Sequence, residues 1–400
     1  MLLLYLHMSR MKTQCSKSWT DVNIDFKNRL LRHCCKAKPY NFPDKPGIDF
    51  FDNSLQIQER RQHTANGIQH PDCNSCWRDL NSGNAAYKDW MNKWDDNEFD
   101  TKDLRKSHIN YIEIELDNTC DLSCLYCSSL CSSKIAQEEN IVNIDNTRSY
   151  DIDQFKLWLV KVAADSNDRT VINFLGGEPT ASKLFYELLS VIHTISKQHP
   201  NFDLQVEICT NGNSKKHLMD KLIASIDASS IDWVISVSNE SYGTDSELIR
   251  YGLNWDRFVD NLIRYMTHPN VVSINFAPTV NALNLRTFAK YINFVQDLLA
   301  KHAPTQFFGW VGNYVSIPEQ LDIKLLPAEY KQYIIAAKEQ IALEKNNSFF
   351  TNYERFYIFL TEMERRIASE FTPDYQQQLQ EFIDEKQRVK QTDKLNRLIL

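Results

Sequence analysis

The sequence predicts an α/β protein built on a parallel sheet, with a cysteine-rich region before the sheet and a helical region after it. From His108 to Leu326, strand-like apolar stretches alternate with helical patterns, the order of a parallel sheet with crossover helices. In such folds the chemistry lies at the carboxyl ends of the strands. The strand-like stretches are 111–117, 170–175, 204–209, 233–238, 272–279 and 309–317, and the helical patterns are 151–164, 181–197, 214–226, 245–267 and 285–301.

The apolar periodicity of individual elements supports this assignment. In the first strand, aliphatic residues alternate with acidic ones, as in a half-buried strand. The aliphatic residues are Ile112, Ile114 and Leu116, and the acidic residues are Glu113, Glu115 and Asp117. The second helix has one apolar face at helical spacing, made by Leu184, Phe185, Leu188, Leu189, Ile192 and Ile195. A similar stripe near the C-terminus predicts a helix that packs on the sheet: Tyr353, Phe356, Tyr357, Leu360 and Met363.

Shifts in composition divide the chain into four predicted regions. Residues 1–93 are cysteine-rich, and an alternating stretch between Cys15 and Cys34 predicts a small hairpin whose ends carry these cysteines. Residues 94–107 are charged and poor in aliphatic side chains, which is typical of a linker. The sheet region, 108–326, and a helical extension, 327–400, follow.

The overall composition gives no indication of a membrane protein or of a nucleic-acid-binding protein. The chain is 42% hydrophobic and 24% charged, with a formal net charge of −7, so it gives no electrostatic indication of nucleic-acid binding. No run approaches the roughly 20 apolar residues of a membrane span, and the leading MLLLYLH lacks a cleavage-site pattern. We therefore expect a cytoplasmic protein, in which ten cysteines are more natural as metal ligands than as disulfides.

The most informative stretch follows the first strand and carries Cys120, Cys124 and Cys127 with the spacing C-x3-C-x2-C. Three thiolates on one tight loop suit a cubane iron–sulfur cluster, which usually takes four cysteines, and would leave one iron open. Zinc is the main alternative, although a structural zinc site normally has four protein ligands. The other alternative is that the three cysteines share this loop by chance and bind no metal. Of the remaining cysteines, we expect Cys209 to lie in the core as an inward strand residue.

The loop resembles the CxxxCxφC signature of the radical S-adenosylmethionine (SAM) superfamily, with Tyr126 as the aromatic φ. The resemblance implies a partial (β/α)6 TIM-like barrel and a [4Fe-4S] cluster whose open iron is chelated by SAM. The reduced cluster then cleaves SAM to methionine and a 5′-deoxyadenosyl radical that abstracts hydrogen from the substrate. A reductant such as flavodoxin or ferredoxin is the implied electron donor.

Polar turns after the later strands resemble further motifs of the same family. The turn after the second strand matches the family's GGEP, whose backbone and Glu side chain meet the SAM amino group, and residues after the third strand resemble its TNG. Residues after the fourth strand lie where the family binds the SAM ribose and carboxylate, although Ser238 departs from the usual sequence. The implied cofactor contacts are Tyr126, Gly176, Gly177, Glu178, Pro179, Thr210, Asn211, Ser236 and Ser238, with Glu240 as an additional candidate.

The N-terminal cysteines form a second candidate metal site. Two distant cysteines and a C-x2-C suit either zinc or a second Fe–S cluster, and the spacing alone favours neither. The arrangement resembles the auxiliary-cluster twitch domain of a group of phage and bacterial radical SAM proteins that carry it at the N-terminus, which implies a second cluster. The implied ligands are Cys15, Cys34, Cys73 and Cys76, and Cys35 could replace Cys34.

The substrate is the least determined part of the prediction. Relatives with auxiliary clusters often modify peptides, so a peptide or protein side chain is our first expectation. A nucleotide, a sugar or an RNA base is the alternative within the same class of enzyme. The alternative from another class is a non-catalytic zinc or Fe–S binding protein on the same fold, which would not need both the cysteine loop and the GGEP turn.

Overall fold

The computed structural model describes residues 15–34, 36–42, 55–66, 68–74, 76, 108–142, 149–166, 168–302 and 306–398. Cys35 and the predicted linker lie outside these residues. The described residues belong to two compact units. The first comprises those within Met1–Asp117, Ile144–Leu175 and Lys183–Val206, and the second those within Asn118–Asn143, Gly176–Ser182 and Glu207–Leu400.

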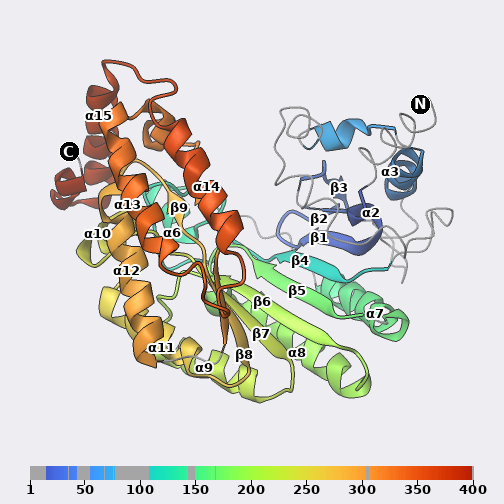
Figure 1. Ribbon diagram of the computed structural model, residues 1–400. Helices are drawn as coiled ribbons and strands as arrows, with labels where there is room; N and C mark the ends of the chain where they lie inside the picture. Colours follow the sequence, from blue (N-terminus) through green and yellow to red (C-terminus); the bar gives the residue numbers. More distant parts are fainter. Residues whose placement is uncertain are drawn as a thin grey trace. The chain divides into compact units, whose positions relative to one another are not determined.

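The first unit contains a sheet with the strand order β5-β4-β1-β2-β3 (Figure 1). β1 and β2 pair in antiparallel register, which confirms the predicted hairpin. β1 also pairs in parallel with β4, so that Val22 lies opposite Ile112, and β4 pairs in parallel with β5. The sequence did not predict that the N-terminal hairpin would extend this sheet. The strands are β1 (Asp21–Asp25), β2 (Leu30–Arg32), β3 (Tyr40–Asn41), β4 (Tyr111–Glu115) and β5 (Thr170–Leu175).

Helices α7 (Ser149–Asp165) and α8 (Lys183–Gln198) pack against each other in this unit. Phe155 of α7 meets Phe26 edge to face at 5.9 Å, and Phe185 of α8 meets Phe174 of β5 in the same way at 5.0 Å. The apolar face predicted for α8 is buried as expected. The unit also contains α2 (Lys17–Thr20), α3 (Leu55–Ala65) and the 3-10 turn η1 (Pro71–Cys73).

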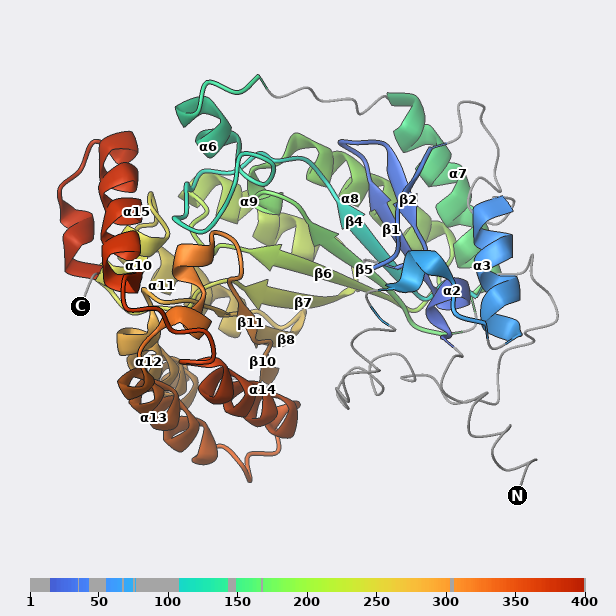
Figure 2. The same ribbon diagram turned by 90° about the horizontal axis from the view of Figure 1, so that it is seen from above.

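The second unit contains parallel strands in the order β6-β7-β8-β10, with helices between them (Figure 2). A two-stranded sheet of β9 and β11 lies beside it. Its strands are β6 (Leu204–Thr210), which begins in the first unit, β7 (Asp232–Val237), β8 (Val271–Phe276), β9 (Thr279–Val280), β10 (Phe307–Trp310) and β11 (Asn313–Tyr314). The helices that follow or connect them are α6 (Ser133–Glu138), α9 (Lys216–Asp227), α10 (Thr244–Ile249), α11 (Trp255–Met266) and α12 (Leu285–His302).

Two predicted elements of this unit are divided in the structure. The helix expected over 245–267 is two helices, α10 and α11, because Gly252 has a φ of 103° and the Asn254 side chain caps the second helix by accepting from the Arg257 N–H at 2.9 Å. The strand expected over 309–317 ends at Trp310. The chain then leaves the main sheet, and β11 pairs with β9 instead.

The C-terminal region is helical, as predicted, and α12, α13 (Lys331–Ala342) and α14 (Tyr353–Arg366) lie side by side (Figures 1 and 2). In the predicted stripe, Phe356 is buried and stacks on Trp310 of β10 at 5.4 Å. The last helix is α15 (Tyr375–Lys390). A mostly parallel sheet with helices is thus confirmed as the fold class. Among the described residues, no helix combines the length and apolarity that a membrane crossing needs.

Candidate functional site

The cysteine loop lies in the second unit and is held by backbone hydrogen bonds. The Ser123 N–H donates to the Tyr251 carbonyl and the Leu125 N–H to the Ile249 carbonyl, both at 2.9 Å. Within the loop, the Cys127 N–H donates to the Cys124 carbonyl at 3.1 Å. The segment between α10 and α11 therefore acts as a support for the loop, which is the structural reason why the predicted long helix is interrupted there.

The three thiols of the loop are half-buried and form no disulfide. Burial raises the pKa of Cys120 to about 12 and that of Cys124 to about 11. Contact with the Cys131 thiol is the main cause of the raised pKa of Cys127. In the metal-free chain these groups are therefore protonated at neutral pH, and a metal that binds their thiolates must displace protons. Soft thiolate donors of this kind fit an iron–sulfur cluster.

The GGEP turn, Gly176–Pro179, lies directly against the cysteine loop. The Glu178 N–H donates to the Thr119 carbonyl at 2.7 Å. A Cβ atom on Gly177 would lie 2.3 Å from the same carbonyl oxygen, which no side chain could tolerate. Gly176 has a φ of 132°, a conformation available to glycine. Glycine is thus required at position 177 because the two segments touch through their backbones, and at position 176 because of its positive φ.

The Glu178 carboxylate is 2% exposed and joins the GGEP turn to the end of β6. Oε1 accepts hydrogen bonds from the Thr180 N–H at 3.1 Å, the Thr180 hydroxyl at 2.7 Å and the Thr210 hydroxyl at 2.8 Å. Oε2 accepts from the Asn211 N–H at 2.7 Å. Burial raises the pKa of Glu178, while these donors oppose that shift. The side chain holds the turn in place, and its contact with SAM stays a prediction.

Replacing Glu178 with Gln should destabilise the protein by about 1–3 kcal/mol, because one backbone donor loses its acceptor in a buried site. Whichever way the amide is turned, its NH2 group faces the N–H of Thr180 or of Asn211. Urea denaturation measures the effect. The matched control is Glu187→Gln, at an exposed i,i+4 pair with Lys183, where the change should be below about 0.5 kcal/mol. Equal effects at the two positions would contradict this account of Glu178.

The TNG segment is connected to the cysteine loop through Asp121, a residue outside the predicted set of site residues. Asp121 Oδ1 accepts from Asn211 Nδ2 at 2.9 Å, and Oδ2 accepts from Asn213 Nδ2 at 2.8 Å. Asn213 Oδ1 in turn accepts from the N–H of Asn254, the cap of α11. The end of β6, the cysteine loop and the start of α11 are therefore connected by one network of hydrogen bonds.

Tyr126, the aromatic residue of the loop, contacts a buried ion pair. Arg250 donates to Glu240 through Nε at 3.0 Å and Nη2 at 2.7 Å, and the two residues are 5% and 0% exposed. The Tyr126 hydroxyl donates to Glu240 Oε1 at 3.0 Å, and the guanidinium lies 5.7 Å from the centre of the Tyr126 ring. Glu240 was expected as an additional SAM contact. In the structure its carboxylate binds Arg250 and Tyr126 within the protein.

The two predicted serines lie where β7 ends, among other polar side chains. Ser236 Oγ accepts from Asn275 Nδ2 at 3.4 Å, and the Ser238 N–H donates to the Thr210 carbonyl at 2.8 Å. Ser238 Oγ lies 3.2 Å from the sulfur of Cys209. Cys209 is half-buried, on the opposite side of β6 from its buried residues. The expectation that it lies in the core was wrong, because the other alternating set of β6 faces the core.

The N-terminal cysteines lie in the first unit, where Cys34 and Cys76 are each 6% exposed and Cys15 and Cys73 are half-buried. Burial is the main cause of the raised pKa of Cys15, about 12, and of Cys73, about 11. Smaller contributions come from the charge of Cys73 on Cys15 and of Cys76 on Cys73.

Two charged or polar side chains lie beside this set. Burial lowers the pKa of Lys17, but its ion pair with Asp21 and, to a smaller extent, the nearby Cys15 and Cys34 raise it above the usual value. His33 Nε2 lies 3.9 Å from the Cys73 sulfur, while its Nδ1 lies 3.1 Å from Arg60 Nη1. Because a guanidinium can only donate, Nδ1 is the acceptor and Nε2 carries the proton, which points to the sulfur.

Comparisons with known proteins give one curated relative and several similar structures. No family model matches the chain. Molybdenum cofactor biosynthesis protein 1 from Dictyostelium discoideum is 24% identical over 255 residues, which cover 61% of this chain and 37% of that protein. The chain thus spans little more than a third of the length of this relative.

The similar structures include anSMEcpe with bound AdoMet and the Cp18Cys peptide, at 15% identity and a TM-score of 0.41, covering 60% of this chain and 62% of that one. They also include Streptococcus suis SuiB bound to the precursor peptide SuiA, at 15% identity and a TM-score of 0.41, covering 84% and 72%.

Proposed function

We propose that the chain is a radical SAM enzyme. Cys120, Cys124 and Cys127 would hold three irons of a [4Fe-4S] cluster, and the fourth iron would take SAM. A bound cluster, reduced by one electron from the proposed reductant, would supply the reductive cleavage of SAM by which a hydrogen atom would be removed from the substrate. The protein supplies orientation and excludes water and oxygen.

The observation that carries this proposal is the direct backbone contact between the cysteine loop and the GGEP turn. Thr119 and Glu178 are 59 positions apart in the sequence, yet the Glu178 N–H donates to the Thr119 carbonyl, and Gly177 leaves no room for a side chain between the two segments. A cluster on the loop and a ligand on the turn would therefore be neighbours. A non-catalytic metal site would need the cysteines but not this contact.

The surrounding residues have separate tasks in this proposal. The Glu240–Arg250 pair and Tyr126 fix the centre of the loop, so that Cys124 and Cys127 keep their positions when the thiolates form. Asp121 and Glu178 orient Asn211 and Thr210 at the end of β6. Ser236 and Ser238 add hydroxyl groups at the end of β7 and are proposed as further SAM contacts, together with Gly176 and Pro179.

We propose that Cys15, Cys34, Cys73 and Cys76 hold a second Fe–S cluster in the first unit. The burial of Cys34 and Cys76 in the same unit as Cys15 and Cys73 supports a thiolate-bound centre, and the N–H of His33 near Cys73 would favour a sulfur that carries negative charge. A structural zinc ion remains the alternative because it uses the same ligands.

The proposed substrate is a peptide or protein side chain. The support for it is the N-terminal cysteine arrangement, since the auxiliary-cluster proteins that this arrangement resembles often modify peptides. A flavodoxin or ferredoxin is the proposed reductant. We place the enzyme in the cytoplasm, where thiols are kept reduced.

The test is a SAM-cleavage assay after anaerobic reconstitution with iron and sulfide. We expect about eight irons per chain and dithionite-dependent 5′-deoxyadenosine, since each cubane holds about four irons. The Cys120/Cys124/Cys127→Ala variant should retain about four irons and form no 5′-deoxyadenosine. Activity with about four irons plus zinc would reassign the N-terminal site to zinc. A reconstituted parent protein that binds iron but never cleaves SAM would overturn the proposed function.

A further inference from the structure

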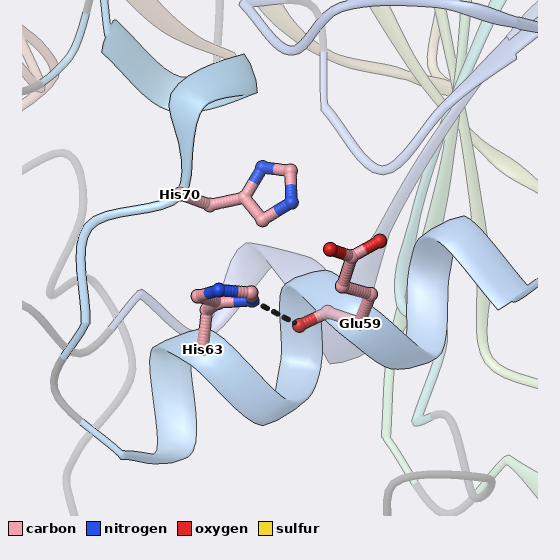
Figure 3. A group of neighbouring side chains, drawn as sticks. All are labelled: Glu59, His63 and His70. Atoms are coloured by element: carbon pink, nitrogen blue, oxygen red, sulfur yellow. Dashed lines mark hydrogen bonds between the residues drawn. The ribbon is translucent and has the colours of Figure 1, made fainter.

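Three metal-binding side chains gather in the first unit, apart from the cysteines. They are Glu59 and His63 of α3 and His70, which precedes η1 (Figure 3). One donor atom from each residue lies within 4.8 Å of the donor atoms of the other two. Figure 3 shows the carboxylate and the two imidazole rings turned toward a common space. Neither the proposed SAM site nor the proposed second cluster uses these residues.

The local fold explains how they meet. Glu59 and His63 are four residues apart, so they share one face of α3. The chain then turns back, because the Ile68 N–H donates to the His63 carbonyl at 2.8 Å. This turn brings the His70 ring to 4.9 Å from the His63 ring, with an angle of 81° between them. The ion pair of Arg60 with Asp72 connects the same two segments at 2.5 Å, so the geometry exists without an ion.

The hydrogen bonds of the two histidines suit metal binding. His63 Nδ1 lies 2.8 Å from the Glu59 carbonyl oxygen. Because a carbonyl can only accept, Nδ1 carries the proton, and Nε2 presents its lone pair. A backbone carbonyl in this role is a common orienting partner of metal-bound histidines.

His70 can offer a second imidazole nitrogen. In the structure its Nδ1 accepts from the Asp72 N–H at 3.2 Å, and the Asp72 carboxylate lies 3.8 Å from the same nitrogen. For Nε2 to bind an ion, the proton must move to Nδ1, the Asp72 N–H must give up this acceptor, and the Asp72 carboxylate must close in from 3.8 Å to accept the hydrogen bond of Nδ1. The result is a carboxylate–histidine–metal arrangement.

We propose that Glu59, His63 and His70 bind one divalent transition-metal ion of the zinc type. Two imidazoles and a carboxylate are a donor set that zinc accepts, with the fourth position left to water. Glu59 is exposed and His63 half-buried, so an ion can enter from solvent. The ion would link α3 to η1 and so fix the position of the segment that carries Cys73 and Cys76.

The test is a cobalt titration of the reconstituted protein, in which the cysteines are already occupied, followed by competition with zinc. We expect one further ion per chain, with a visible spectrum that lacks thiolate charge-transfer absorption. His63→Ala should weaken binding at least about tenfold, because even the loss of an orienting partner of a ligand costs 10–100-fold. Glu59→Gln, which keeps the shape of the side chain, should weaken it in the same direction.

The matched control is His217→Ala, at an exposed position of α9 in the second unit, which should leave the affinity unchanged. Far-ultraviolet circular dichroism of each variant verifies that α3 is still folded. Equal affinities in His63→Ala, Glu59→Gln and His217→Ala would overturn the proposal, and so would a thiolate absorption band from the added cobalt. Neither outcome depends on SAM cleavage, so this proposal fails or stands separately from the enzyme function.

Discussion

Replacing Arg250 with Met should lower the free energy of unfolding by about 3–5 kcal/mol, because it leaves the Glu240 carboxylate buried without a cation. Glu240 is 0% exposed, and its remaining side-chain donor in the site is the Tyr126 hydroxyl. The substitution should also reduce cluster binding, because the Glu240 carboxylate holds Tyr126, which lies between two of the loop cysteines. Urea denaturation of the metal-free protein measures the first effect, and iron content after reconstitution measures the second.

The double variant Glu240→Leu/Arg250→Met distinguishes the cost of a lone charge from the value of the pair. Replacing a buried ion pair by apolar side chains is often neutral, so the double variant should recover most of the stability lost in Arg250→Met. Its iron content should stay reduced if the hydrogen bond to Tyr126 positions the loop. If the free energy of unfolding of Arg250→Met lies within about 1 kcal/mol of the parent value, the ion pair does not support the loop as described.

Replacing Gly177 with Ala should separate the GGEP turn from the cysteine loop. The added Cβ would lie 2.3 Å from the Thr119 oxygen and 2.7 Å from the Asn118 carbonyl carbon, and both are backbone atoms that cannot rotate away. We expect SAM affinity to fall at least about tenfold, which corresponds to about 1.4 kcal/mol. Equilibrium dialysis with labelled SAM on the reconstituted protein measures the change.

Gly243 provides the control for this substitution. It has a φ of 59° and a ψ of −135°, and a Cβ atom added there would meet nothing within 4 Å, so Gly243→Ala introduces backbone strain of about 1–3 kcal/mol without a clash. SAM affinity should be unchanged in Gly243→Ala. If Gly177→Ala binds SAM as well as Gly243→Ala does, the contact between turn and loop has no part in the binding of SAM.

The alternating pattern of the sequence was sufficient to predict the parallel sheet and most of its helices. Local periodicity determines which residues of α8 face the sheet, and the structure buries that face. The same reasoning failed at Gly252, where the pattern of apolar residues continues through a break in the helix. The break follows from the backbone conformation of Gly252 and from hydrogen bonds with the cysteine loop. The spacing of apolar residues carries no information on either.

The site could be predicted only where a short motif carries its own chemistry. The cysteines and the GGEP turn have such motifs. Asp121 and Asn213 are ordinary polar residues whose roles arise from a contact between positions 92 apart. The position of Glu240 in the sequence predicts a ligand contact, whereas the structure pairs its carboxylate with Arg250. The cluster of Glu59, His63 and His70 was missed for a similar reason, since His70 joins it only through the turn after α3.

The central claim is that the cluster on the three-cysteine loop has one iron open to SAM, and electron paramagnetic resonance tests it most directly. The reduced spectrum would be recorded before and after SAM addition, in a Cys73→Ala/Cys76→Ala background that removes the proposed second cluster. We expect the signal to shift, because SAM changes the ligands of one iron. A spectrum that SAM leaves unchanged, although dialysis shows SAM bound, would contradict the claim.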